Sequence, residues 1–405
     1  MSTDTPDGSR TLLDDVRAFA FPRFAGTAGE RRAGDLLQQR FEGLGLAVVR
    51  EPFTTSRHVV FRWRLFLHAA VALAVVALAV AARAEPRVAA LLGAALLATM
   101  VGLGRWRRGL ESSFDVGETV ESENVVARRP ATDPRAVRAV VVAHRDSKSS
   151  ALPTLVPGLI ILAVALFTLL VTAAAGVAWL AGSGPLVAGW LVPGGGILAA
   201  LLVAVAFNRP GDRSPGALDN ASGLAVLLRA AERLAAGEDL RSVDLTFLAT
   251  GAEEIGLAGA LRWIQAHEAE LDPERTIVVN VDSVGVGTTL LAADLRGRAP
   301  HGEPVAQLVR AAADAAGVRV RTAPFLPGAG VDSMPLGARG LPTVTILGQV
   351  FGAAAGRMHS PRDRVEFLDE KALGAAVDLV VEVVRRASGC PPGEAGRGSL
   401  TGSPP

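Results

Sequence analysis

The chain has 405 residues, 50% of them apolar, and a formal net charge of +1 at pH 7. A charge this close to neutral gives no indication of a nucleic-acid partner, because proteins that bind nucleic acids concentrate Lys and Arg against the phosphates. The single cysteine, Cys390, excludes an internal disulfide framework and a metal site built from thiolates. The polar, acidic N-terminal residues do not have the pattern of a signal peptide.

The first 57 residues have a polar pattern, and a long apolar segment follows them. Apolar runs cover residues 65–82 and 88–104, and each is close to the ~20 residues that cross the hydrocarbon core of a bilayer. Arginines flank both runs, as is common at membrane boundaries. We therefore predict a transmembrane hairpin over 58–104, and a pair of buried core helices is the alternative.

A second apolar block extends over residues 152–207. It is long enough for two further spans, at 155–180 and 186–207. The second of these contains Pro193-Gly-Gly-Gly196, which we expect to kink or break the helix. The prediction is thus four transmembrane helices in two hairpins, each of which returns the chain to the side from which it came.

The pieces 10–57, 105–151 and 208–388 alternate between helical and strand-like periodicity. Helices are expected near 30–44, 221–236, 257–270, 302–316 and 368–387, and strands near 46–53, 122–127, 136–144, 243–249, 276–282, 318–322 and 342–348. This alternation predicts one α/β domain with a mostly parallel or mixed sheet and helices on both faces. The tail 389–405, rich in Gly, Pro and Ser, is expected to be disordered.

Basic residues flank the predicted spans unevenly. The far turns carry two of them, Arg83 and Arg87. Nine lie at the ends next to the α/β pieces: Arg57, Arg62, Arg64, Arg105, Arg107, Arg108, Lys148, Arg209 and Arg213. Because Lys and Arg accumulate on the cytoplasmic side of membrane proteins, this asymmetry predicts a multi-pass protein whose α/β domain is cytoplasmic.

Histidines and carboxylates lie at the ends of several predicted strands or just before a helix. They are His144, Asp219, Glu253, Glu254, Asp282 and His359. In open α/β sheets the ligand crevice lies beyond the carboxyl ends of the strands, so these side chains are expected to face one crevice. Each residue taken alone can be explained without a metal, because a carboxylate before a helix is usually a cap and adjacent glutamates are usually solvated.

Two imidazoles and three carboxylates are a ligand set that suits zinc better than magnesium or calcium. Two ions about 3.5–4 Å apart require a bridging carboxylate, which the aspartate before the helix, Asp219, is placed to supply. The adjacent side chains of Glu253 and Glu254 diverge, so both cannot easily bind one ion. One is expected to ligate while the other acts as a general base.

In these motifs the chain resembles the di-zinc aminopeptidases and carboxypeptidases of metallopeptidase family twenty-eight. The resemblance covers about 10–57, 110–150 and 208–388. It is carried by Ala143-His-Arg-Asp146-Ser147, Gly216-Ala-Leu-Asp-Asn-Ala-Ser-Gly223, Gly251-Ala-Glu-Glu-Ile-Gly256, Asn280-Val-Asp282 and His359-Ser-Pro-Arg-Asp363. The fold it implies is that of the zinc exopeptidases, here interrupted by two transmembrane hairpins.

The resemblance also implies a role for each matching residue. Asp219 would bridge two zinc ions, one completed by Glu254 and His359 and the other by His144 and Asp282. Two further residues would be catalytic: Asp146 would orient His144, and Glu253 would move a proton from the attacking water to the leaving amine. The implied activity is a membrane-anchored aminopeptidase acting on short peptides.

Three departures from the family pattern bear on the substrate. Arg145 follows the first histidine where an aromatic residue is frequent, the chain contains no tyrosine, and Val331-Asp332-Ser333 replaces a Ser-Asp-His segment. Two other functions therefore stay open: hydrolysis of another amide, such as a lipid-linked or N-acyl substrate, and a non-catalytic receptor or scaffold. The side-chain preference, the end of the peptide that is trimmed and the oligomeric state do not follow from the sequence.

Overall fold

The computed structural model describes residues 10–102, 119–132, 136–153, 155–237, 240, 243–296, 303–323 and 330–389. The chain divides into two compact units. The sheet unit comprises Met1–Phe53, Glu121–Ser149 and Asp212–Pro405, and the helical unit comprises Thr54–Val120 and Ser150–Gly211. Most of the tail predicted to be disordered lies outside the described residues.

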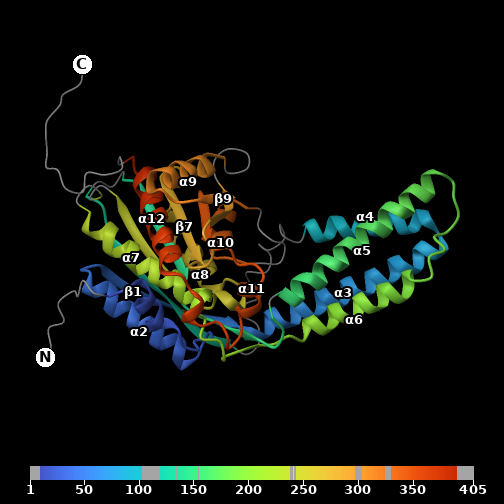
Figure 1. Ribbon diagram of the computed structural model, residues 1–405, viewed down its shortest axis with the longest axis horizontal. Helices are drawn as coiled ribbons and strands as arrows, with labels where there is room; N and C mark the ends of the chain where they lie inside the picture. The colour runs from blue at the N-terminus through green and yellow to red at the C-terminus, as the bar shows by residue number, and fades with distance from the viewer. Residues whose placement is uncertain are drawn as a thin grey trace, which may run out of the picture. The chain divides into compact units, whose positions relative to one another are not determined.

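Within the described residues, the sheet unit is built on an eight-stranded sheet in the order β1-β2-β6-β3-β7-β10-β8-β9 (Figure 1). The strands are β1 (Ala47–Ser56), β2 (Thr119–Arg129), β3 (Arg138–His144), β6 (Asp244–Thr250), β7 (Thr276–Asp282), β8 (Leu290–Arg296), β9 (Val320–Thr322) and β10 (Thr343–Leu347). The central strands β6, β3, β7 and β10 are mutually parallel, whereas β2 and β8 run antiparallel to them. The predicted mixed sheet is therefore confirmed, although β8 was not predicted.

Helices cover both faces of this sheet, as predicted. They are α1 (Leu12–Phe19), α2 (Ala28–Gly43), α7 (Ser222–Ala236), α8 (Ala258–His267), α9 (Glu303–Ala316), α10 (Ser333–Ala338), α11 (Ala353–Arg357) and α12 (Glu370–Ala387). Alternate residues of β3 separate the two cores: Val141 packs with α7 and α12 on one face, and Val140 packs with Trp263 of α8 on the other. Strands buried on both faces are expected to be continuously apolar, which β3 is.

The register of the parallel strands places their carboxyl ends at one edge of the sheet. His144, the last residue of β3, pairs with Thr250, the last residue of β6. Asp282, the last residue of β7, pairs with Leu347, the last residue of β10. The segments that follow these four strands therefore all begin at the same edge.

The helical unit consists of four apolar helices in its described part, α3 (Arg57–Ala84), α4 (Pro86–Gly102), α5 (Leu155–Leu180) and α6 (Leu191–Ala206). Helix α3 packs on α6, and α4 packs on α5 (Figure 1). Glycine makes both contacts close, because a Cβ on Gly195 would meet Ala79 of α3 at 3.1 Å and one on Gly93 would meet Thr172 of α5 at 1.9 Å. Small residues at such positions are typical of helices that pack in membranes.

Two of these four helices are long and apolar enough to cross a bilayer. They are Arg64–Ala84 and Leu155–Leu180, each with a mean hydropathy of 2.6, while α4 and α6 are shorter. Among the described residues the structure thus supports two candidate spans where four were predicted. A buried helix of a soluble protein would pass the same test of length and composition.

The prediction that Pro193 kinks or breaks the helix is wrong, because the proline lies at the start of the helix. Helix α6 begins at Leu191 and not near residue 186, which places Pro193 in its first turn. The first four N–H groups of a helix have no intrahelical acceptor, so the missing N–H of proline costs nothing there. The helix then continues through Gly194, Gly195 and Gly196 without a break.

Close packing of α8 on the segment after β6 gives a test of the fold. A Cβ on Gly259 would lie 2.3 Å from the carbonyl oxygen of Gly251, which is backbone and cannot move aside. We expect Gly259→Ala to lower the free energy of unfolding by about 1–3 kcal/mol. The matched control is Gly43→Ala in α2, where a Cβ meets nothing within 4 Å. Chemical denaturation of both variants measures the difference, and equal stabilities would contradict this packing.

Candidate metal centre

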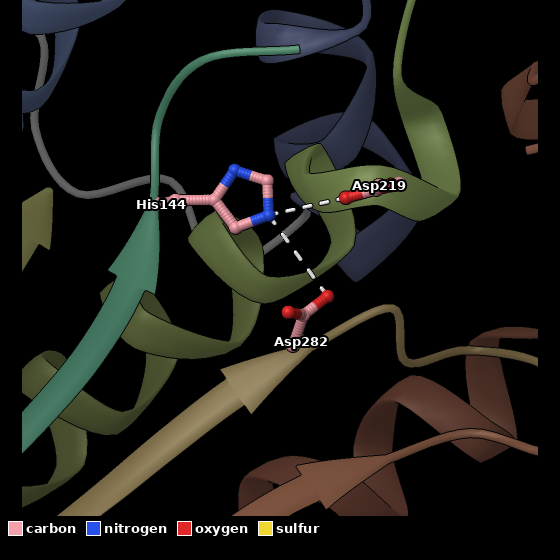
Figure 2. Close-up of side chains that lie close together, drawn as sticks. All are labelled: His144, Asp219 and Asp282. Carbon is pink, nitrogen blue, oxygen red and sulfur yellow. Dashed lines mark ion pairs between the residues drawn. The ribbon is translucent and has the colours of Figure 1, made fainter. Parts of the chain in front are cut away.

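Three acidic or imidazole side chains converge at the carboxyl edge of the sheet (Figure 2). His144 lies at the tip of β3, Asp282 at the tip of β7, and Asp219 in the turn Ala217–Ala221 before α7. The Nε2 atom of His144 lies 3.1 Å from Oδ1 of Asp219 and 3.9 Å from Oδ1 of Asp282. All three side chains are buried, so this group of charges is shielded from solvent.

A second group of the same kind lies beside the first. The Nε2 atom of His359 lies 2.7 Å from Oδ2 of Asp219 and 3.3 Å from Oε1 of Glu254. Glu254 belongs to the short turn Glu253–Ile255 after β6, and His359 follows α11. In each group the possible ligand atoms lie within 4.8 Å of one another.

The carboxylate of Asp219 belongs to both groups. Its Oδ1 faces His144 and its Oδ2 faces His359, so the two oxygens of one side chain are divided between two histidines. A carboxylate that bridges two metal ions needs this division. The structure therefore brings together all five residues that the sequence predicted as ligands, around one shared aspartate.

The spacing of these atoms fits a metal ion. Two ligand atoms at ~2.0–2.1 Å from one tetrahedral zinc ion are about 3.3 Å apart. The closest histidine–carboxylate pairs of the two groups span 2.7 to 3.9 Å. In addition, Oε1 of Glu254 is buried and accepts no hydrogen bond from the described residues. A buried carboxylate oxygen without a donor is costly, and a cation would satisfy it.

The turn that carries Asp219 is held by two buried side chains. The carboxylate of Asp363 accepts hydrogen bonds from the backbone N–H groups of Leu218 and Asp219, at 2.7 and 3.2 Å. The guanidinium of Arg23, which is fully buried, donates to the carbonyl oxygens of Pro215 and Gly216. These bonds fix the backbone that leads into the bridging position.

Asp146 supports the site through the glutamate pair. Its Oδ1 and Oδ2 accept hydrogen bonds from the backbone N–H groups of Glu253 and Glu254, at 3.0 and 3.2 Å. Its own carbonyl oxygen lies 3.1 Å from Nδ1 of His144, nearer than its carboxylate at 3.5 Å. Asp146 thus contacts His144, as predicted, mainly through its main chain, while its carboxylate positions the turn that carries both glutamates.

Glu253 differs from its neighbour Glu254 in that it belongs to neither ligand group. Its side chain is 7% exposed. Burial raises the pKa of Glu253 well above its usual range, and Glu254, Asp332 and Asp282 add to this rise, although His144 opposes it. A carboxyl group with a raised pKa is suited to accept and return a proton near neutral pH.

Comparison with known proteins relates most of these residues to one family. Residues 200–384 match the family model of peptidase family M28. This match spans fewer than half of the residues of the chain, and it includes Asp219, Glu253, Glu254, Asp282 and His359 but not His144. The chain is therefore a metallopeptidase, as the sequence motifs predicted. No curated protein matches the chain by sequence.

Solved structures of this fold include two aminopeptidases and a glutaminyl cyclase. An aminopeptidase from Aneurinibacillus sp. strain AM-1 has 16% identity and a TM-score of 0.54, covering 96% of each chain. A zinc aminopeptidase from Bacillus subtilis has 16% identity and a TM-score of 0.54, over 95% of this chain and 96% of that one. A glutaminyl cyclase from an Acidobacteriales bacterium has 13% identity and a TM-score of 0.52, over 96% and 99%. Identities this low establish the fold alone.

One departure from the M28 pattern has a structural explanation. Arg145, which stands where an aromatic residue is frequent in that family, is 1% exposed. It forms ion pairs with Glu30 at 3.5 Å and Glu123 at 3.6 Å. The side chain of Arg145 thus belongs to a buried charge network between α2, β2 and the end of β3. It does not contact a substrate.

Two charged residues of the centre were not identified from the sequence. The Nζ atom of Lys148 lies 2.5 Å from Oε2 of Glu254. Asp332 is buried, and its carboxylate accepts a hydrogen bond from the hydroxyl of Thr250. The only signals available were the position of Lys148 four residues after His144, and that of Asp332 in a segment where the family has a charged motif. Neither signal specifies a contact.

Charge within the metal-free centre is balanced by protons. Burial and the ammonium of Lys148 lower the pKa of His359, but Glu254 and Asp219 outweigh them and raise it to about 9. A metal ligand must be a neutral imidazole, so an incoming cation displaces this proton. Metal and protons therefore compete for the same side chains.

This balance predicts how the stability of the metal-free chain depends on pH. Burial raises the pKa of Asp332 and that of Asp363 to about 7, against about 3.9 in an unfolded chain. A carboxyl whose pKa is raised by folding stabilises the fold below its unfolded pKa, and that contribution is lost as the pH rises through the folded pKa. We expect the unfolding temperature of the chelated protein to fall between pH 5 and pH 8.

The matched variant for this measurement is Asp332→Asn, which removes one titrating group. We expect it to flatten the pH dependence, since each such proton contributes up to about 1.4 kcal/mol per pH unit. Thermal unfolding followed by circular dichroism at a series of pH values measures both curves. Stability of the chelated wild-type chain that increases steadily from pH 5 to pH 8 would contradict the assignment.

Proposed function

We propose that this M28 chain is a membrane-anchored aminopeptidase that binds two zinc ions and hydrolyses short peptides. The observation that carries the proposal is the division of the Asp219 carboxylate between His144 and His359. One ion would be held by His144, Asp219 and Asp282, and the other by Asp219, Glu254 and His359. A pair of closely spaced ions joined by one carboxylate is a common arrangement for hydrolysis of amides.

The donor set favours zinc. Each group offers one imidazole and two carboxylates, and with three protein ligands it leaves a fourth position for water or substrate, as catalytic zinc sites do. When bound, zinc supplies Lewis-acid chemistry, since it polarises a carbonyl group and lowers the pKa of water. The residues of the chain then have to position the substrate and move one proton.

Glu253 is the residue we assign to the proton. In the proposed reaction it accepts a proton from the attacking water and returns it to the nitrogen of the leaving amine as the C–N bond breaks. Its burial favours this task, because it raises the pKa of Glu253 well above its usual range. Asp146 would hold the backbone of Glu253 in place through the 3.0 Å hydrogen bond to its N–H group.

Substitution of the proposed base tests the mechanism. We expect Glu253→Gln to lower kcat by about 10²–10⁴ while zinc content stays unchanged, because glutamine has a similar shape but cannot accept the proton. The matched control is Glu121→Gln, at an exposed position of β2, which should leave both quantities unaltered. Zinc content by atomic emission and turnover of aminoacyl-nitroanilides measure the two effects. Normal turnover in Glu253→Gln would end the assignment of this residue.

The fold alone does not decide which amide is attacked, because an aminopeptidase and a glutaminyl cyclase have similar TM-scores to this chain. We expect the purified protein to shorten peptides from the amino end. Mass spectrometry of a peptide-library digest shows which end of each peptide is shortened. The library should include a peptide with an N-terminal glutamine. Loss of ammonia without cleavage would indicate cyclisation, while metal without either reaction would favour another amide substrate.

The surface of the helical unit supports the membrane assignment. Only 28% of the Arg64–Ala84 window and 22% of the Leu155–Leu180 window are buried, so most of these apolar residues face outward. Leu166, Leu170 and Val177 of α5 are among the exposed ones. An apolar surface of this extent is stable in lipid and not in water. The shorter helices α4 and α6 are proposed to complete the two hairpins.

Fractionation of expressing cells tests the membrane assignment. We expect the full chain to remain in the membrane pellet after extraction with alkaline carbonate and to require detergent for release. We propose from the nine basic residues beside the spans that the sheet unit is cytoplasmic, so protease added to intact spheroplasts should leave it uncut. Release by carbonate would contradict the spans, and cleavage in intact spheroplasts would contradict the orientation alone.

A further inference from the structure

Lys148 stands out because lysine is rare in this chain. The sequence contains 41 Lys and Arg residues, and only two of them, Lys148 and Lys371, are lysines. Lys371 is exposed at the start of α12. Lys148 instead lies at the candidate metal centre, where its ammonium group forms an ion pair with Glu254 at 2.5 Å. A chain that otherwise uses arginine thus has a lysine at this contact.

The two oxygens of Glu254 have different surroundings. Oε2 accepts a hydrogen bond from the ammonium group of Lys148. Oε1 is buried, accepts no hydrogen bond from the described residues, and faces Nε2 of His359 at 3.3 Å. The backbone of Glu254 is fixed as well, because its N–H group donates to Oδ2 of Asp146 at 3.2 Å. One oxygen is therefore occupied and the other is left for a ligand.

The chemistry of the two basic side chains explains why a lysine suits this position. An ammonium is a compact charge that can hold one oxygen, whereas a guanidinium presents a planar fork that matches both oxygens of a carboxylate. Arginine at position 148 would therefore compete for Oε1 as well as Oε2. A neutral residue would leave both oxygens of Glu254 available to one ion.

We propose that Lys148 is a positioning residue that restricts Glu254 to ligation through Oε1 alone. The inference rests on the proposed binding of a second ion by Asp219, Glu254 and His359. Ligation through one oxygen leaves one more coordination position free for a substrate than ligation through two. The positive charge of Lys148 also opposes the ion electrostatically, so the second ion is held less tightly than Glu254 would otherwise allow.

Two substitutions at this position are expected to act in opposite directions. Lys148→Arg should weaken binding of the second ion at least tenfold, because the guanidinium fork engages both oxygens of Glu254. Lys148→Met should strengthen it at least tenfold, because the opposing charge is gone and Oε2 becomes a ligand. The first ion, at His144 and Asp282, should change less than threefold in either variant. Lys371→Arg is the matched control and should change neither affinity.

The measurement is a calorimetric titration of the full chain in detergent, stripped of metal and titrated with Zn²⁺. X-ray absorption of the zinc-loaded proteins provides a second readout, in which Lys148→Met should show more oxygen ligands per ion than the wild-type chain. Weaker binding of the second ion in Lys148→Met, or unchanged binding in Lys148→Arg, would overturn the proposal. A wild-type chain that binds only one ion would instead overturn the two-ion centre itself, so the two failures are distinguishable.

If Lys148→Arg failed to fold, its circular dichroism and its binding of the first ion would be lost together. Lys148→Met then decides the proposal by itself, because methionine has a similar length and no charge to bury. Tighter second-ion binding with a higher oxygen count supports the positioning role. Tighter binding with an unchanged oxygen count would show that Lys148 acts through its charge alone, and equal affinity would show that it does not act on the ion; either result would make the proposal wrong.

Discussion

The centre of this protein depends on one buried carboxylate that faces two histidines at once. Asp219 lies 3.1 Å from His144 through one oxygen and 2.7 Å from His359 through the other. Taking a carboxylate out of water is costly unless its charge is compensated, so a residue in this position must be held and paired. The hydrogen bonds of Asp363 to the backbone of the turn and of Arg23 to the carbonyls before it provide the support.

The same balance of charge organises the surrounding residues. The carboxylates of the centre outnumber its imidazoles, and the ammonium of Lys148 and the backbone N–H groups that face Asp146 offset part of the excess. The negative charge that is not offset favours binding of a cation. The raised pKa values of His359 and Asp332 therefore apply to the chain without a bound metal ion. Zinc chemistry and pH dependence are two consequences of one buried cluster.

The helical unit has a different surface from the sheet unit. Its helices pair through glycines such as Gly93 and Gly195 and expose apolar side chains outward, whereas the sheet unit buries its apolar residues in two cores. Insertion of such helices into an enzyme domain is tolerated because each pair returns the chain to where it left. The three pieces of the sheet unit can then pair in one sheet, as the order β1-β2-β6-β3 demonstrates.

How much of this could be predicted from the sequence depends on the range of the interactions. Apolar runs identified β3, β6, β7 and β10, and histidines and carboxylates at or after the ends of the strands indicated a metal centre, because parallel strands end at a common edge. The antiparallel strand β8 was missed because its pairing with β10 is non-local. The start of α6 was misplaced because short-range propensity does not locate a helix end in an apolar run.

By itself, then, the sequence determined the residue types of the centre and the strand ends from which they project, since both follow from periodicity within a few residues. Only the tertiary structure decided that the oxygens of Asp219 are divided between two histidines. It also decided that Lys148 occupies one oxygen of Glu254 across a sequence separation of 106 residues. Contacts of this kind depend on the rotamers and packing of segments that meet only in the folded chain.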